Sequence, residues 1–146
     1  MYSLLPSFVA VLFLAYGLYI FAENGLTRIS TNFIVLCLTT FCWQITWAVL
    51  FQVHDPETAL YLIKFGYLLI LFLPTSLYGF LIEISEKPSE RRYVYASYGF
   101  AALLGIVLFS SDSLIDGYYQ YAFGYYPKAG TLHPIHILQT CLVVSR

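Results

Sequence analysis

Long apolar segments alternate with short polar ones along the 146-residue chain. Residues 4–22, 32–53, 59–84 and 93–110 form four such segments, and each is about as long as the 20 apolar residues that a helix needs to cross a bilayer. A fifth apolar segment, residues 131–146, runs to the end of the sequence. The pattern predicts a single domain, residues 1–146, with five transmembrane helices.

The connections between these segments predict how the helices are arranged. All are short except residues 112–130, and short connections place neighbouring helices antiparallel. We therefore expect an all-α membrane protein, an up-and-down bundle of five transmembrane helices. The fifth helix is expected to be short because the sequence ends within it.

Composition agrees with a membrane protein and excludes one class of partner. The chain is 60% apolar and only 10% charged, whereas about a quarter of the residues in soluble domains are charged. A net charge of −1 offers no basic surface for nucleic acid. Because the three cysteines lie in apolar segments without a CxxC spacing, we expect neither a disulfide nor a zinc site.

The basic residues predict the orientation in the membrane. The first and third connections carry Arg28, Lys87, Arg91 and Arg92, whereas the second has no Lys or Arg and the fourth has only Lys128. Under the positive-inside rule, the N-terminus lies outside and the fifth helix ends inside. The first segment lacks a basic region before it and is expected to remain as a membrane helix. The stretch "SEKPSERR" is interpreted as a solvated cytoplasmic turn.

Lys64 is the only cation within the third segment, about 7–8 Å below its outer end. One interpretation is that its ammonium extends to the lipid headgroups. The other is that it faces the bundle interior and binds an anion. Polar and aromatic side chains at similar depth would complete a site for an amphipathic ligand. The candidate ligand-binding residues are Lys64, His133, His136, Gln44, Trp47, Tyr67 and Gln139.

Three further features have both a structural and a functional interpretation. The tyrosines of the fourth connection either anchor it at the membrane interface or form a lid, with a hairpin turning near Gly124. Ser97, Ala101 and Gly105 provide small residues for packing within the bundle or in a homodimer. Pro74 removes a hydrogen bond within the third helix and is a candidate hinge. The candidate lid residues are Tyr118, Tyr121, Tyr125 and Tyr126.

The sequence shows no sign of catalysis. It contains no GxSxG, HExxH or glycine-rich phosphate loop. His133 and His136 stand three residues apart, but no third ligand lies nearby in sequence, so we expect no metal. No catalytic residue and no cofactor is expected.

Several of these features together resemble a known family. They are the order of the spans, "ITWAVL" in the second, "LFLPTSLYGF" in the third and "GYYPKAGTLHPIH" before the fifth. They resemble the multi-helix sensor region at the N-terminus of bacterial histidine kinases, which usually has seven helices followed by a kinase. Similar five-helix regions occur on sensors of fatty-acid diffusible signal factors, used in quorum sensing. The resemblance implies a bacterial inner-membrane protein in a two-component system, with its kinase in the cytoplasm.

Three functions are compatible with the sequence. The first is a receptor that binds a small amphipathic signal in the outer half of the bundle and passes a helix shift inward. The second is a transporter or channel subunit, which the scarcity of ionisable groups in the inner halves of the spans disfavours. The third is a structural anchoring or assembly module. The partners expected for the receptor are the lipid bilayer, the signal molecule, the attached kinase region and a second copy of the chain.

Overall fold

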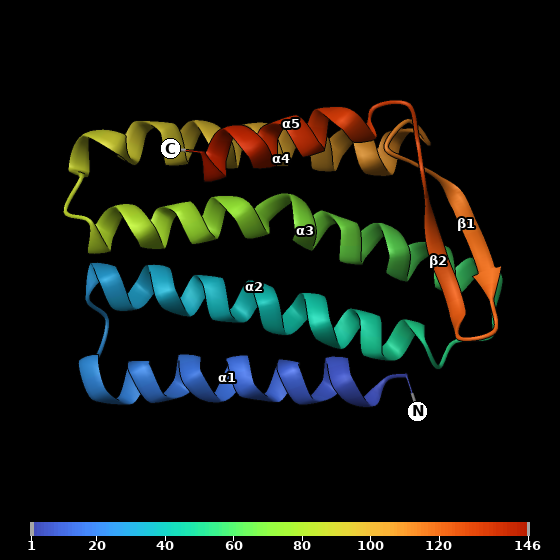
Figure 1. The fold of residues 1–146 in the computed structure, drawn as a ribbon, viewed down its shortest axis with the longest axis horizontal. Coiled ribbons are helices and arrows are strands. Elements are labelled where there is room, and N and C mark those ends of the chain that lie inside the picture. Colours follow the sequence, from blue (N-terminus) through green and yellow to red (C-terminus); the bar gives the residue numbers. More distant parts are fainter. Residues whose placement is uncertain (1, 146) are drawn as a thin grey trace.

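The computed structural model describes residues 2–145 and shows an antiparallel helical bundle with a β-hairpin at one end (Figure 1). The helices are α1 (Leu4–Asn24), α2 (Arg28–Leu50), α3 (Pro56–Ile84), α4 (Arg91–Ser110) and α5 (His133–Val144), with a 3₁₀ turn at Pro88–Glu90. The hairpin consists of β1 (Ile115–Tyr121) and β2 (Gly124–Ala129). The predicted all-α membrane bundle is confirmed, with the hairpin lying outside it.

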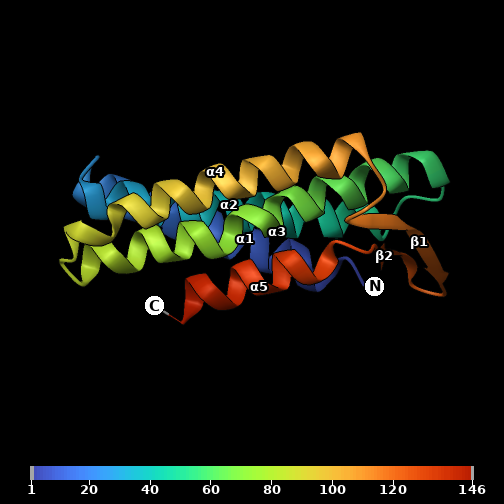
Figure 2. The ribbon, with the colours of Figure 1, turned by 90° about the horizontal axis from the view of Figure 1, so that it is seen from above.

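The helices lie in a row that ends in a cluster around α3. Helices α1, α2 and α3 lie side by side in chain order, and both α4 and α5 pack against α3 (Figures 1 and 2). In the described residues, four helices are long and apolar enough to cross a membrane. Helix α5 has 12 residues and spans only about 18 Å. The start of α5 adjoins the hairpin (Figure 1). We call this end of the bundle the hairpin end and the opposite end the basic end.

Two helices begin several residues earlier than predicted because polar side chains cap them. The Thr27 hydroxyl accepts a hydrogen bond from the backbone N–H of Ser30 at 3.2 Å, so α2 begins at Arg28. The Asp55 carboxylate accepts hydrogen bonds from both the backbone N–H and the hydroxyl of Thr58, so α3 begins at Pro56. Lys64 therefore lies about 12 Å from the start of α3, farther along the helix than the 7–8 Å predicted from the sequence.

The core of the bundle is built around α3. Leu71 of α3, Leu108 of α4 and Leu114 before β1 are fully buried in one cluster. By contrast, Ala10 and Gly17 are the buried residues of α1, whose large apolar side chains are mostly exposed. Exposed apolar side chains on a helix that crosses a bilayer contact lipid tails. Helix α1 is thus a lipid-facing edge of the bundle.

The small residues of α4 pack within the chain. The hydroxyls of Ser97 and Thr75 lie 2.6 Å apart, Ala101 is fully buried, and Gly105 lies against Leu68 of α3. A small residue every fourth position lets two helices approach closely, and here the partner is α3. This agrees with the interpretation of the stripe as packing within the bundle, and a homodimer stays a prediction.

Candidate functional site

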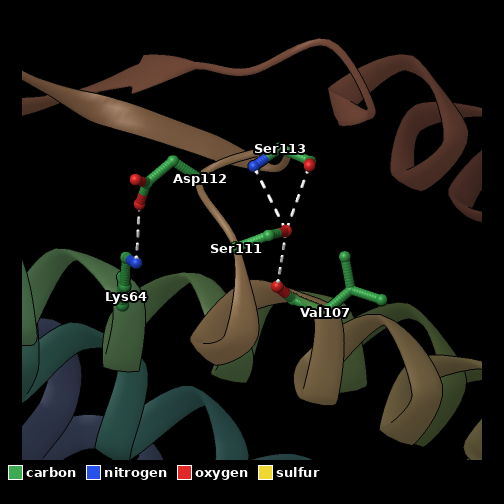
Figure 3. Close-up of polar contacts among 5 residues, drawn as sticks. All are labelled: Lys64, Val107, Ser111, Asp112 and Ser113. Carbon is green, nitrogen blue, oxygen red and sulfur yellow. Dashed lines mark hydrogen bonds and ion pairs between the residues drawn. The ribbon is translucent and has the colours of Figure 1, made fainter.

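Lys64 has a partner in the chain. Its ammonium donates a hydrogen bond to Asp112 Oδ1 at 3.0 Å. Figure 3 shows the Lys64 side chain, from α3, pointing toward that of Asp112 in the connection between α4 and β1. The Lys64 side chain is 14% exposed, whereas that of Asp112 is 74% exposed. The Lys64 side chain is therefore mostly buried, but its ammonium is paired with a carboxylate on the exposed surface. Asp112 lies 48 positions after Lys64 and is not among the residues predicted from the sequence to lie near it.

The two histidines meet a tyrosine of α3. Nδ1 of His133 lies 2.6 Å from the Tyr67 hydroxyl, and Nδ1 of His136 lies 3.3 Å from the same oxygen. Tyr67 is 5% exposed and His136 7%. The predicted shared face of the two histidines is confirmed, but they contact Tyr67, whereas Lys64 is bound to Asp112. The structure thus divides the candidate set into two adjoining groups.

The polar groups between α3 and α5 form a hydrogen-bonded chain. Beyond Tyr67, Nε2 of His136 lies 3.4 Å from the hydroxyl of Thr140. In one proton order, Thr140 donates to His136, His136 to Tyr67, and Tyr67 to His133. In the reverse order each donor becomes an acceptor, and both orders satisfy these contacts. Inside a membrane such a chain holds two helices together because no water competes for the groups.

The same chain lies near the turn of α3 that precedes its proline. Pro74 lies inside α3, which continues through it as a helix. Because proline has no N–H, the carbonyl of Ile70, four residues earlier, has no donor within the helix. The ring of His136 lies near this carbonyl, while its two nitrogens face Tyr67 and Thr140. The turn of α3 that precedes the candidate hinge therefore lies close to α5.

The other candidate ligand residues do not join this chain. Gln139 is buried, and neither its amide oxygen nor its amide nitrogen has a hydrogen-bond partner among residues 2–145. Gln44 is half-buried on α2. The ring of Trp47 contacts those of Phe51 and Tyr126 in tilted arrangements, with centroid distances of 5.9 and 6.0 Å. Its indole N–H is buried and has no hydrogen-bond partner among residues 2–145. Gln139 instead lines an apolar cleft of about 300 Å³ between α4 and α5.

The hairpin covers the end of the bundle next to Lys64. The hairpin turns just before Gly124, as predicted. The φ angle of Gly124 is +125°, a value that glycine adopts readily. The hydroxyl of Tyr125 donates to the backbone carbonyl of His54 at 2.8 Å, and Phe123 packs against Phe51 and Tyr2. The strands are linked by Lys128 and Asp116 at 2.8 Å, a hydrogen bond that raises the pKa of Lys128.

The four candidate lid tyrosines differ in how they are held. Tyr125 is buried and packs edge-on against Tyr118, which is half-buried. Tyr126 reaches Trp47 of α2, and Tyr121 stacks on Phe123 with ring centroids 5.2 Å apart. Tyr121 and Tyr126 are both about half exposed. The hairpin is thus fastened to the ends of the helices chiefly through Tyr125 and the aromatic side chains around the turn.

Comparison with known proteins places this arrangement in a family. No curated protein and no solved structure gives a match. The family described as the N-terminal 7TM region of histidine kinase matches residues 5–145. This region is the membrane-spanning sensor part of such kinases and is not itself catalytic. Since the match covers nearly all of the chain, the chain belongs to the family of N-terminal 7TM regions of histidine kinases.

Proposed function

We propose that this chain is the signal-input domain of a sensor kinase in a bacterial inner membrane. It binds a small amphipathic, fatty-acid-like signal in the outer half of the bundle and passes a helix shift to a cytoplasmic kinase. The observation that carries the proposal is the polar contact between α3 and α5, in which Tyr67 joins His133 and His136 beside Lys64. Burying polar or ionisable side chains inside a membrane costs free energy, and such residues in membrane helices commonly have a function.

The carboxylate of the signal would bind Lys64 in place of Asp112. The Asp112 side chain is mostly exposed, and ion pairs at a wet rim contribute only about 0–1 kcal/mol. Exchanging one carboxylate for another therefore costs little, and burial of the tail supplies the affinity. The tail would lie among the apolar side chains of α3 and α5, a region that adjoins the α4–α5 cleft.

The shift would pass from α3 to α5 through His136. A ligand moves an equilibrium only by binding one arrangement better than the other. His136 contacts Tyr67 and lies near the Ile70 carbonyl that Pro74 leaves without a donor, so a bend at Pro74 would change the position of α5. Under the predicted orientation, α5 runs toward the cytoplasm, where the kinase would receive the shift.

The hairpin would act as the lid over this site. Tyr125 fastens it to the connection before α3, and Trp47 contacts Tyr126 from α2. Opening would require loss of these contacts and removal of Tyr125 from the core cluster. Replacing both Tyr125 and Tyr126 by alanine should therefore speed signal entry, measured as the on-rate of a labelled fatty acid. Equal on-rates would remove the lid from the proposal.

The test of the site uses the kinase that carries this region. Lys64→Ala should abolish or strongly weaken the autophosphorylation response to a fatty-acid signal while membrane insertion stays normal. Lys128→Ala is the matched control, because Lys128 is also paired with an aspartate at the hairpin end. An unchanged dose-response in Lys64→Ala, or an equal loss in Lys128→Ala, would contradict the assignment of Lys64.

A further inference from the structure

The basic end of the bundle carries a charged recess. A cavity of about 450 Å³ lies between the start of α2, the end of α3 and the start of α4. In Figure 1 this is the end opposite the hairpin, where the α1–α2 and α3–α4 connections lie. Three cations line the cavity, Arg28, Lys87 and Arg91, together with two carboxylates, Glu83 and Glu86.

The charges of this recess are only partly neutralised. Arg91 donates two hydrogen bonds to the Glu83 carboxylate, at 2.7 and 2.8 Å. The two side chains therefore form a bidentate ion pair. Arg28 and Lys87 form no salt bridge among residues 2–145. They come from different connections and line the same cavity. The lining therefore has a net charge of +1, with Glu86 as a second carboxylate and with Arg28 also acting electrostatically on Glu83. Arg28 and Lys87 are the two cations outside the salt bridge, and these are the ones that an anion could bind.

The backbone of the recess adds to the positive potential. Arg28 and Ile29 are the first residues of α2, and the first N–H groups of a helix have no carbonyl partner within it. On the other side, Glu86 has φ +53°, a left-handed conformation that is costly for a residue other than glycine. The following N–H, of Lys87, donates to the carbonyl of Ile82 at 3.0 Å. This turn holds Lys87 at the rim of the recess.

An apolar cleft adjoins the recess. It measures about 310 Å³, shares Thr27 and Ile29 with the recess, and is otherwise lined mainly by apolar side chains of α1, α2 and α3, among them Ile20, Phe33 and Phe80. A cationic recess at the membrane rim followed by an apolar cleft matches a molecule with an anionic head and an apolar tail. A soluble anion would use only the first part.

We propose that the recess and the cleft together bind an anionic phospholipid of the cytoplasmic leaflet. The phosphate lies between Arg28 and Lys87, and one acyl chain lies in the cleft between α1, α2 and α3. Basic residues of the cytoplasmic connections place this end at the leaflet that is rich in anionic lipid. The lipid would tie the start of α2 to the α3–α4 turn, a site separate from Lys64 and independent of the proposed outer signal.

The test is a titration of the purified 146-residue chain in neutral detergent with dioctanoyl phosphatidylglycerol. Binding is followed by native mass spectrometry and compared with dioctanoyl phosphatidylcholine, inorganic phosphate and tail-free glycerophosphoglycerol. Each cation near an anionic surface contributes about 1 kcal/mol, so the variant carrying Arg28→Gln and Lys87→Gln should bind phosphatidylglycerol about thirtyfold more weakly. The variant carrying Arg92→Gln and Lys128→Gln loses the same charge elsewhere and should bind normally.

Several results would overturn the proposal. They are equal binding of the two phospholipids, equal losses in the two double variants, and binding of inorganic phosphate as tight as that of phosphatidylglycerol. The last result would mean that the recess holds a soluble anion. The comparison of the two lipids on the unmodified chain needs no variant, so the proposal remains testable if a double variant does not fold.

Discussion

Replacing Tyr67 with phenylalanine tests the contact on which the proposed signal path depends. The substitution removes only the hydroxyl, so the ring still fills its place in the core cluster and no large cavity forms. Two interhelical hydrogen bonds are lost, at 2.6 and 3.3 Å. Such bonds contribute on average about 0.6 kcal/mol in membrane proteins and at most about 1.7 kcal/mol. The free energy of unfolding should therefore fall by about 1–3 kcal/mol.

The assay is reversible unfolding of the purified chain in mixed micelles, with Tyr61→Phe as the matched control. Tyr61 lies on the same helix but is 72% exposed, so its hydroxyl should contribute less than about 0.5 kcal/mol. Nitrogen chemical shifts of the imidazoles give a second readout. Nδ1 of His133 should change its hydrogen-bonding state in Tyr67→Phe and stay unchanged in Tyr61→Phe.

Two results would refute this reasoning. If Tyr67→Phe unfolds at the same free energy as the unmodified chain, the hydroxyl does not link α3 to α5. If Tyr61→Phe loses as much stability as Tyr67→Phe, the loss reflects the general removal of a hydroxyl and not the contact with the histidines.

Three other substitutions test separate parts of the structure. Gly105→Leu should lower the free energy of unfolding by about 1–3 kcal/mol, because even a Cβ at this position would lie 2.7 Å from the side chain of Leu68. Gly99→Leu is the control and should have little effect, because open space surrounds Gly99. Equal effects of the two substitutions would contradict the α3–α4 packing. Tyr125→Phe frees the His54 carbonyl and should speed amide hydrogen exchange in the hairpin, whereas unchanged exchange would mean that this bond does not fasten it. Hydrogen bonds from the Thr58 hydroxyl and backbone N–H hold the pKa of Asp55 below its ordinary value of 3.8. The ionised Asp55 cap therefore stabilises α3 fully at neutral pH, and this stabilisation is lost as the pH falls through the lowered pKa. In thermal melts at several pH values Asp55→Asn should remove this acid-dependent loss, and an identical pH profile would argue against the cap.

The helical bundle could be predicted because apolar length is a strong signal. About 20 apolar residues are needed to cross a bilayer, and four segments meet that condition without ambiguity. The helix starts were less predictable, since they depend on side-chain caps. Thr27 and Asp55 each extend a helix into a stretch that hydropathy alone assigns to a loop.

The candidate site was predictable only in part because hydropathy does not determine helix rotation. Spacing alone placed His133 and His136 on one face, and the structure adds Tyr67 between them. Asp112 could not be predicted as the partner of Lys64, because the two residues are 48 positions apart. Asp112 also lies in a polar connection, where the sequence does not determine the direction in which a side chain points. The alternating charges of "SEKPSERR" suggested a solvated turn, although Arg91 is bound to Glu83 and Lys87 lines a cavity.

The most direct test of the proposed function is photo-crosslinking of a tailed carboxylate to the purified chain, followed by mapping of the labelled residues. The label should concentrate on α3 and α5 near the hairpin end, and Lys64→Gln should reduce it sharply while Lys128→Gln leaves it intact. A label spread evenly over the lipid-facing surfaces of α1 and α4, and unaffected by Lys64→Gln, would contradict a signal site at the α3–α5 contact.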